Sequence, residues 1–417
     1  MSSEPITAPS PFHAGERQVQ AKLGVSDIED WARKVVRPYL PDQHREFYAK
    51  LPFLVAAARD DQGRPWVTLL AGREGFVETP DDRTLVIDAK PVPGDALEGA
   101  LAEEVDLGLL GIEFATRRRN RVNGRISANR AGLTVSVDQS FGNCPQYIRE
   151  RAWHWVEDPD AGEPLIGTAL TAEQSEWIGK ADTFFIASGH RDEGENPAFG
   201  MDASHRGGDP GFVVAETANR LVFPDYAGNN HYNTIGNLVL DPRVGLLFVD
   251  FETGSLLQLS GRAEIDWDSA ARANFPGARR LVRIDIEAVI ELPRALPLRW
   301  DSEAESVRSL RVVDKVRESA DVTSFLFEAR DGGLLTPFEA GQHLPIELHV
   351  TGHEEPVRRT YSLSGAPNAG RYRLSVKREE RGAASRHLHD AVEVGEIIDA
   401  RQPSGDFVLP CTHCPIV

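Results

Sequence analysis

The chain of 417 residues has few cysteines and a large excess of acidic over basic side chains. Three cysteines in a chain of this length cannot form a disulfide framework, so we expect a reducing compartment. The net charge of −18 argues against nucleic acid or an anionic membrane as the main partner. No apolar run approaches the length needed to cross a bilayer, and the N-terminus lacks the pattern of a signal peptide. We therefore expect a cytoplasmic protein.

Two redox signatures are also missing from the sequence. There is no G-x-G-x-x-G dinucleotide fingerprint and no C-x₄-C-x₂-C run for a plant-type iron–sulfur centre. Cys411 and Cys414 form a C-x-x-C pair, for which metal or redox work stays open beside a chance pairing. We assign no metal site.

The length allows two or three domains with separate cores. Residues 1 to about 15 are rich in Pro and Ser, which predicts a flexible arm. Ser26 is a candidate N-cap for a helix, and Pro41 with Asp42 can start a second one. From Leu51 the pattern changes to short strands, interrupted by a predicted helix over 95–104.

An internal repeat relates this strand-rich region to the one that follows it. Gly75 matches Gly211 and Leu85 matches Leu221, both 136 residues apart, since 211 − 75 = 221 − 85 = 136. Gly108 matches Gly245 and Gly124 matches Gly261, both 137 residues apart, since 245 − 108 = 261 − 124 = 137. Generic strand patterning explains shared apolar residues but not glycines at nearly constant spacing, so we predict a duplicated domain.

The second copy carries residue types suited to a nucleotide phosphate. The run SHRGG offers the Ser204 hydroxyl, His205, the Arg206 cation and accessible backbone at Gly207. Tyr226, Asn229, Asn230 and Thr234 crowd a turn before a short helix that contains Asn237, whose N-terminus could face a phosphate. Ordinary turn chemistry and a solvated loop are the alternative readings.

The runs SHRGGDPGFV, FPDYAGNNHYNTIGNL and QSFGNCPQYI resemble the pyridoxamine 5′-phosphate oxidase-like FMN-binding split-barrel family, in a long tandem form over about residues 10–300. The resemblance implies FMN bound where two barrels meet, so the duplicated chain would form a pseudo-dimer by itself. It assigns phosphate binding to Arg206 and further cofactor contacts to Ser204, Asn230, Thr234 and Asn237. Pyridoxal chemistry is not implied, because no counterpart of that enzyme's substrate-phosphate residues is evident.

The first copy carries the basic cluster RRRNR over 117–121 instead, which could reach the phosphate across the barrel seam, and from it we expect Arg117 and Arg119 to contact the cofactor. A solvated basic turn explains the cluster equally well. His205 is the candidate proton donor near the flavin, with a structural or phosphate contact as the alternative. Cys144 could line the flavin or simply pack.

The segment from Ser306 is again strand-rich and contains RTYSLS followed by LSVKR and GAAS. This order resembles ferredoxin reductase-like FAD domains. The resemblance implies that Arg359 pairs with the pyrophosphate, Tyr361 stacks on the isoalloxazine and Ser362 lies near its N5. It implies further that Lys377 contributes to the site and that Gly382 and Ser385 present a helix N-terminus to the pyrophosphate.

We therefore expect a mainly β protein with some α structure. Its two tandem split β-barrels, 1–160 and 161–300, form a pseudo-dimer, and a Greek-key flavin-binding β-barrel follows over 306–417. That barrel would be truncated before the nicotinamide domain, which is missing or separate.

The expected function is that of a flavin-dependent oxidoreductase passing electrons from NAD(P)H via FAD to FMN and on to a small-molecule acceptor. NAD(P)H or a reductase would be a partner, and the chain could be a homodimer. A non-catalytic flavin-binding or electron-transfer module with a vestigial FAD half is the alternative, and haem binding is a third reading that no histidine spacing supports.

Overall fold

The computed structural model describes residues 10–102, 104–129, 132–144, 146–268, 270–301, 308–330, 335–350, 356–367, 370–380 and 382–405. The Cys411–Cys414 pair lies outside these residues. The chain divides into two compact units. One comprises Met1–Ile112, Arg119–Ile148 and Trp153–Trp300, and the other comprises Glu113–Arg118, Arg149–Ala152 and Asp301–Val417. The predicted boundary between the two split barrels near residue 160 stays a prediction.

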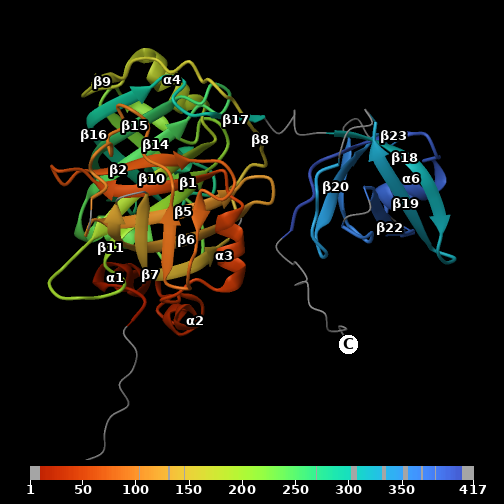
Figure 1. Ribbon diagram of the computed structural model, residues 1–417, viewed down its shortest axis with the longest axis horizontal. Helices are drawn as coiled ribbons and strands as arrows, with labels where there is room; N and C mark the ends of the chain where they lie inside the picture. Colours follow the sequence, from red (N-terminus) through yellow and green to blue (C-terminus); the bar gives the residue numbers. More distant parts are fainter. Residues whose placement is uncertain are drawn as a thin grey trace, which may run out of the picture. The chain divides into compact units, whose positions relative to one another are not determined.

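The chain is built mainly from strands (Figure 1). The helices are α1 (Ala14–Leu23), α2 (Ile28–Val35), α3 (Asp42–Ala49), α4 (Ala172–Lys180), α5 (Asn233–Leu240) and α6 (Ala383–Asp390), with a 3₁₀ turn at Ala270–Asn274. The strands before α4 are β1 (Phe53–Arg59), β2 (Pro65–Ala71), β3 (Val77–Glu78), β4 (Thr84–Ile87), β5 (Asp106–Glu113), β6 (Arg118–Asn129), β7 (Leu133–Asn143), β8 (Ala152–Trp155) and β9 (Leu165–Gly167).

The later strands complete the first compact unit and form the C-terminal sheet. They are β10 (Thr183–His190), β11 (Gly200–Gly207), β12 (Val214–Thr217), β13 (Arg220–Asp225), β14 (Arg243–Val249), β15 (Leu256–Asp266), β16 (Arg280–Leu292), β17 (Leu298–Asp301), β18 (Arg308–Arg317), β19 (Val322–Ala329), β20 (His343–Leu348), β21 (Val357–Ser362), β22 (Tyr372–Lys377) and β23 (Ile397–Ala400). The predicted mainly β fold class is confirmed.

The two large sheets have the same topology. The first runs β2-β1-β5-β6-β7-β4-β3 and the second runs β11-β10-β14-β15-β16-β13-β12, with β9 added beside β16. We call β1–β7 the first barrel and β10–β16 the second barrel. Both long hairpins even shift register at matching places, before Gly124 in β6 and before Gly261 in β15. A shared strand order with a shared bulge is what duplication of one domain produces.

Each barrel packs against the other through an equivalent contact. A Cβ on Gly108 of β5 would lie 2.5 Å from the carbonyl oxygen of Met201, at the start of β11. A Cβ on Gly245 of β14 would lie 2.6 Å from the carbonyl oxygen of Pro65, at the start of β2. The matched glycines of the repeat therefore let each barrel approach the other's edge strand, and the barrels form the predicted pseudo-dimer.

The described part of the predicted flexible arm, residues 10–15, is packed. Phe12 and His13 are buried, and α1 begins at Ala14. The Glu16 side chain accepts a hydrogen bond from the His13 backbone N–H at 2.8 Å, as in a capping box. The prediction of a flexible arm to residue 15 is thus wrong over its last residues, because the HAGE sequence caps a helix that packs on α5.

Two other local predictions have different outcomes. The helix predicted to start at Pro41-Asp42 is confirmed as α3. The helix predicted over 95–104 is wrong, because the described residues of that stretch form turns and irregular backbone. Gly99 has a φ of 79°, in the left-handed region that interrupts a helix.

The sheet of the C-terminal unit, which we call the C-terminal barrel, runs β21-β20-β23-β18-β19-β22. A bridge between Leu363 and Leu374 joins its two edges and closes it. Phe325, Phe327 and Leu374 are among its fully buried core residues. Helix α6 packs against β21, which carries the RTYS sequence. Among the described residues, no helix is long and apolar enough to span a membrane.

Candidate functional site

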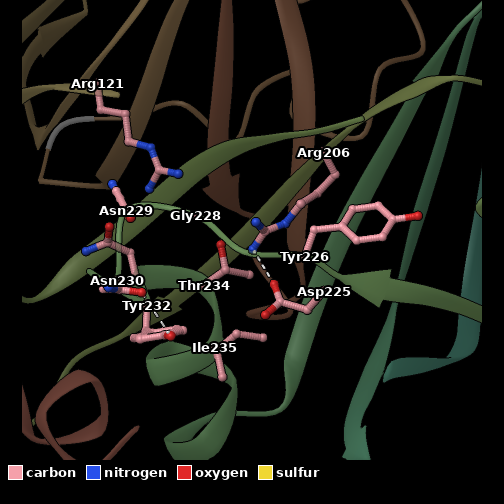
Figure 2. Close-up of a pocket in the computed structure, with 11 residues that line it drawn as sticks. Arg121, Arg206, Asp225, Tyr226, Gly228, Asn229, Asn230, Tyr232, Thr234 and Ile235 are labelled. Carbon is pink, nitrogen blue, oxygen red and sulfur yellow. Dashed lines mark hydrogen bonds and ion pairs between the residues drawn. The ribbon is translucent and has the colours of Figure 1, made fainter. Parts of the chain in front are cut away.

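A pocket opens over the N-terminus of α5, between strands of the two barrels (Figure 2). Its empty volume is about 380 Å³, including space open to solvent. Arg121 comes from β6 of the first barrel, and every other lining residue comes from the second. The lining residues are Arg121, Arg206, Asp225, Tyr226, Gly228, Asn229, Asn230, Tyr232, Asn233, Thr234 and Ile235.

The first turn of α5 presents its backbone N–H groups to this pocket. The N-cap residue Tyr232 has a φ of 59°, and no side chain caps the helix. Asn230 also has a positive φ, of 62°, so the chain makes a sharp turn before the helix. Asn229 stabilises that turn by accepting a hydrogen bond from the His231 N–H at 3.1 Å. An uncapped helix N-terminus favours an anion, because its N–H groups and its dipole carry positive charge.

A chain of side-chain hydrogen bonds joins the two barrels beside this turn. Arg121 donates from Nη2 to the Ser204 Oγ at 2.6 Å, and the Ser204 and Thr234 hydroxyls lie 3.0 Å apart. Arg121 also lies 3.6 Å from an Asp202 carboxylate oxygen. Its Nε and Nη1 are buried without a hydrogen-bond partner among the described residues. Two guanidinium nitrogens of Arg121 therefore lack a hydrogen-bond acceptor among the described residues, although Nη1 forms an ion pair with Asp202, and a ligand can supply the acceptor.

Arg206 approaches the pocket from the second barrel. Figure 2 shows the Arg121 and Arg206 guanidinium groups on either side of Thr234, above the start of α5. Asp225 lies 3.7 Å from Arg206 and 3.2 Å from the buried Arg280. The Arg206 Nε is buried and has no hydrogen-bond partner among the described residues. Asp225 is thus shared between two arginines and leaves positive charge in excess.

The arginines of the site raise one another's electrostatic energy. Burial, together with the charges of Arg121 and Arg206, lowers the pKa of Arg119 to about 9. Burial also lowers the pKa of Arg121 to about 10, against the opposing effect of Asp202. Crowded cations with unfilled donors beside an open helix N-terminus fit a phosphate group, which supplies both the negative charge and the acceptors.

The structure brings most of the predicted FMN residues together. Arg206, Tyr226, Asn229, Asn230 and Thr234 line the pocket, and Ser204 bonds to two lining side chains. Arg119 does not line the pocket. Its Nε donates a hydrogen bond to the Cys144 carbonyl at 2.8 Å.

Four predicted residues have other surroundings. The Arg117 guanidinium pairs with Glu150 at 3.4 Å, and Arg117 does not line the pocket. Asn237 is occupied by His13, Ser188 and Asp202. Gly207 lies under the Tyr147 carbonyl, which a Cβ there would approach to 2.1 Å. The His205 ring is buried against Phe185 with its Nδ1 3.1 Å from Arg119, so its role as a proton donor stays a prediction.

Sequence reasoning selected Arg117 and Arg119 from the basic cluster and not Arg121, which lines the pocket, and it missed two further contributors to the site. Asp225 lies in the FPDY run, directly before the predicted Tyr226, and its acidic type signals a partner for Arg206. Tyr147 stacks on Tyr226 with ring centroids 5.2 Å apart and donates to the Ala227 carbonyl at 3.1 Å. The QYI sequence carries no local sign of this contact, because it depends on the docking of the two barrels.

The predicted FAD residues lie on β21, β22 and the start of α6. Arg359 is exposed and Tyr361 half-buried, two residues apart on β21 and so on one face of the strand. Burial raises the pKa of Tyr361. Ser362 pairs with His343 of β20, and Lys377 ends β22, where its Nζ lies 3.4 Å from Glu379.

Helix α6 begins after Gly382 without a side-chain cap. The Ser385 Oγ accepts from the Glu379 N–H at 3.2 Å and donates to the Gly382 carbonyl at 3.3 Å, which shapes the turn that leads into the helix. Arg359, the Tyr361 ring and an open helix N-terminus are suited to a dinucleotide, since they offer a cation, an aromatic face and free N–H groups.

Comparisons with known proteins match both parts of the chain. Residues 170–297 match the pyridoxamine 5′-phosphate oxidase family, and residues 309–409 match the oxidoreductase FAD-binding domain. The first match covers the second barrel and every pocket-lining residue except Arg121. These matches give the chain an FMN-binding and an FAD-binding type of domain, as predicted.

Similar proteins share only part of their length with this chain. The flavohemoprotein of Burkholderia sp. strain TH2 is 47% identical over 110 residues, which are 26% of this chain and 28% of that protein. The flavohemoprotein of Pseudomonas aeruginosa is 36% identical over 207 residues, which are 50% of this chain and 48% of that protein. The chain therefore spans between about a quarter and a half of these relatives.

Solved structures give partial matches of the same kind. The flavohem-like FAD/NAD binding domain of nitric oxide dioxygenase from Vibrio cholerae is 39% identical, with 25% of this chain and 47% of that chain covered and a TM-score of 0.25. Phthalate dioxygenase reductase is 29% identical, with 26% and 33% covered and a TM-score of 0.24. The two family matches, not these structures, show that the chain carries a pyridoxamine 5′-phosphate oxidase-like domain followed by a ferredoxin reductase-like FAD-binding domain.

Proposed function

We propose that this chain is a flavin-dependent oxidoreductase that passes electrons from NAD(P)H via FAD to FMN and on to a small-molecule acceptor. The FMN phosphate lies between Arg121, Arg206 and the first turn of α5. FAD is held by the C-terminal barrel. Flavins supply the chemistry, since they exchange electrons both in pairs and singly.

The observation that carries the FMN half is the set of unfilled donors in the pocket. Arg121 offers Nε and Nη1, Arg206 offers Nε, and none of these atoms has a hydrogen-bond partner among the described residues. The first residues of α5 line the same space, and no side chain caps the helix. Charge-assisted hydrogen bonds of this kind each contribute about 1.5–3 kcal/mol, which is sufficient to select a phosphate ester over the unphosphorylated flavin.

The FAD half rests on the matched family and on β21. Arg359 would pair with the pyrophosphate, Tyr361 would cover the isoalloxazine, and the α6 N-terminus after Gly382 would face the pyrophosphate. A nicotinamide domain or a separate reductase supplies NAD(P)H electrons in this proposal. A homodimer is part of the same proposal, as are the boundaries of the three barrels.

The test is the flavin content and redox behaviour of the purified protein. We expect a yellow protein that releases both FMN and FAD on heating and that is reduced by NAD(P)H once a reductase domain is added. A colourless protein that takes up neither flavin contradicts the proposal. Release of FMN alone, with no NAD(P)H oxidation even with added reductase, supports the non-catalytic module instead.

A further inference from the structure

The duplicated barrels define a second position related by symmetry to the Arg121 pocket. The equivalent contacts of Gly108 with Met201 and of Gly245 with Pro65 show that each barrel packs against the other in the same way. A residue that one barrel contributes to the pocket therefore has a counterpart in the other barrel. Those counterparts meet on the opposite side of the barrel seam.

Strand register identifies the counterparts without ambiguity. Arg121 pairs with Phe141 in the β6–β7 hairpin, and Gln258 pairs with Ile290 in the matching β15–β16 hairpin. The register shift next to Gly124 and Gly261 confirms this alignment, since both glycines lie three residues after the paired residue. Gln258 is thus the counterpart of Arg121.

The edge strands align in the same manner. Ser204 pairs with Ile186 and Arg206 with Phe184 in the β10–β11 ladder. Thr68 pairs with Ala56 and Leu70 with Leu54 in the β1–β2 ladder. Within each pair of matching strands the offset in residue number is constant. It is 136 between β2 and β11, since 204 − 68 = 206 − 70 = 136, and 130 between β1 and β10, since 186 − 56 = 184 − 54 = 130. Thr68 is therefore the counterpart of Ser204, and Leu70 is the counterpart of Arg206.

The chain itself fills the symmetry-related position. An Asp95 carboxylate oxygen accepts from the Thr68 hydroxyl at 2.5 Å and from the Gln258 amide at 3.0 Å. The other carboxylate oxygen accepts from the Leu97 N–H at 2.8 Å. Thr68, Leu70 and Gln258 are fully buried. Asp95 thus bonds to Thr68 and Gln258. These are the counterparts of Ser204 and Arg121, which bond to each other beside the α5 pocket.

The remaining counterparts also lack features that bind phosphate. Leu256 takes the place of Arg119, because it pairs with Leu292 as Arg119 pairs with Asn143. The connection from β4 to β5 has no helix among its described residues, whereas the matching connection from β13 to β14 contains α5. Among these counterparts and the described residues of the β4–β5 connection there is thus no arginine and no helix N-terminus, and the buried Asp95 carboxylate bonds to two of the counterparts.

From this asymmetry we infer that the tandem barrels bind one FMN, not two. The Arg121 side of the seam binds the flavin, and the Asp95–Thr68–Gln258 side holds the two barrels together. This inference rests on the proposed function, because it concerns the occupancy of the same kind of site.

The test is titration of the flavin-depleted full chain with FMN, with FAD present in excess to keep the C-terminal barrel filled. Fluorescence quenching and flavin analysis of the separated complex both report moles of FMN per chain. We expect a ratio of one. A ratio of two overturns the inference and leaves the proposed function standing. A ratio of zero removes the proposed function.

A pair of matched variants tests whether one side of the seam binds FMN and the other contributes only to stability. Arg121→Ala should weaken FMN binding about 10- to 100-fold. Gln258→Ala should leave the affinity and the ratio unchanged but lower the unfolding temperature on the order of 5 °C, because it leaves a buried carboxylate with one donor fewer. Loss of FMN from a folded Gln258→Ala variant would overturn the inference.

Discussion

Arg121, on β6 of the first barrel, donates a 2.6 Å hydrogen bond to Ser204, on β11 of the second. The guanidinium is buried and reaches the pocket across the seam between two barrels that share one topology. Neither barrel alone holds both arginines of the pocket. The tandem duplication is therefore a condition for the site, because it brings two diverged copies together in one chain.

Replacement of Arg121 by Ala should lower FMN retention about 10- to 100-fold, because charge-assisted bonds to the phosphate are lost. Gel filtration followed by flavin analysis measures the retention. Arg125→Ala is the matched control on the same strand, since Arg125 pairs with Asp106 at 3.4 Å and does not line the pocket. Equal retention in the two variants, both folded by circular dichroism, would count against the phosphate site.

The ring of His231 should make the barrels less stable in mild acid. Burial and the Arg121 charge lower its pKa from 6.5 to about 4. Between these values the unfolded chain binds a proton that the folded chain excludes, so the free energy of unfolding falls as pH falls from 6.5 toward 4. Between pH 7 and pH 5 this loss amounts to about 2 kcal/mol.

The variant His231→Phe should lack this loss, since the ring packs against Phe12 and Phe141 and has no hydrogen bond among the described residues. Urea unfolding followed by tryptophan fluorescence measures the effect in the barrels, because all seven tryptophans lie within residues 31–300. The same pH dependence in the wild type and in His231→Phe would refute the assignment.

Asp95 should produce a pH dependence of opposite sign. Burial raises its pKa from 3.8 to about 6, against the lowering effect of its hydrogen bonds. The folded state binds the proton more tightly, so this contribution to stability is present at low pH and is lost as pH rises from about 4 through 6. Relative to Asp95→Asn, the wild type should be about 1 kcal/mol more stable at pH 5 than at pH 7. If the difference in unfolding free energy between the wild type and Asp95→Asn is the same at pH 5 and pH 7, then Asp95 does not titrate between these pH values.

In the C-terminal barrel, Arg359→Ala should lower FAD retention about tenfold while FMN per chain stays constant. Its neighbour Arg358 is the control, because it pairs with Glu347 at 3.1 Å and points to the other face of β21. Flavin release from both variants, resolved by chromatography, gives the two ratios. If Arg358→Ala and Arg359→Ala lose FAD equally, then Arg359 has no specific role.

Much of this architecture could be predicted from patterns local to the sequence. The glycine spacing between Gly108 and Gly245 and between Gly124 and Gly261 revealed the duplication, because close backbone contact and a bulge constrain those positions in both copies. The order of Arg359, Tyr361 and Gly382 indicated the FAD domain, which the family match confirms. In the pocket, Arg206 and Thr234 were identified from residue type and turn context.

The rest depended on contacts between segments far apart in the chain. Arg121 and Arg117 belong to one basic run, but Arg121 lies in β6 and lines the pocket, whereas Arg117 lies in the turn before β6 and pairs with Glu150. The resemblance assigns Asn237 to the cofactor, and that assignment stays a prediction, while in the structure the His13 ring at the start of α1 lies 2.8 Å from it. No local pattern encodes these pairings, because they follow from how the barrels and α1 pack.

The most direct test of the account compares FMN with riboflavin, which lacks the phosphate, as ligands of the full chain with the FAD site saturated. We predict that the wild type binds FMN about 100-fold or more tightly than riboflavin and that Arg121→Ala loses most of this preference while its riboflavin affinity stays unchanged. Equal affinities of the wild type for FMN and riboflavin would contradict it, as would equal weakening of both ligands by Arg121→Ala.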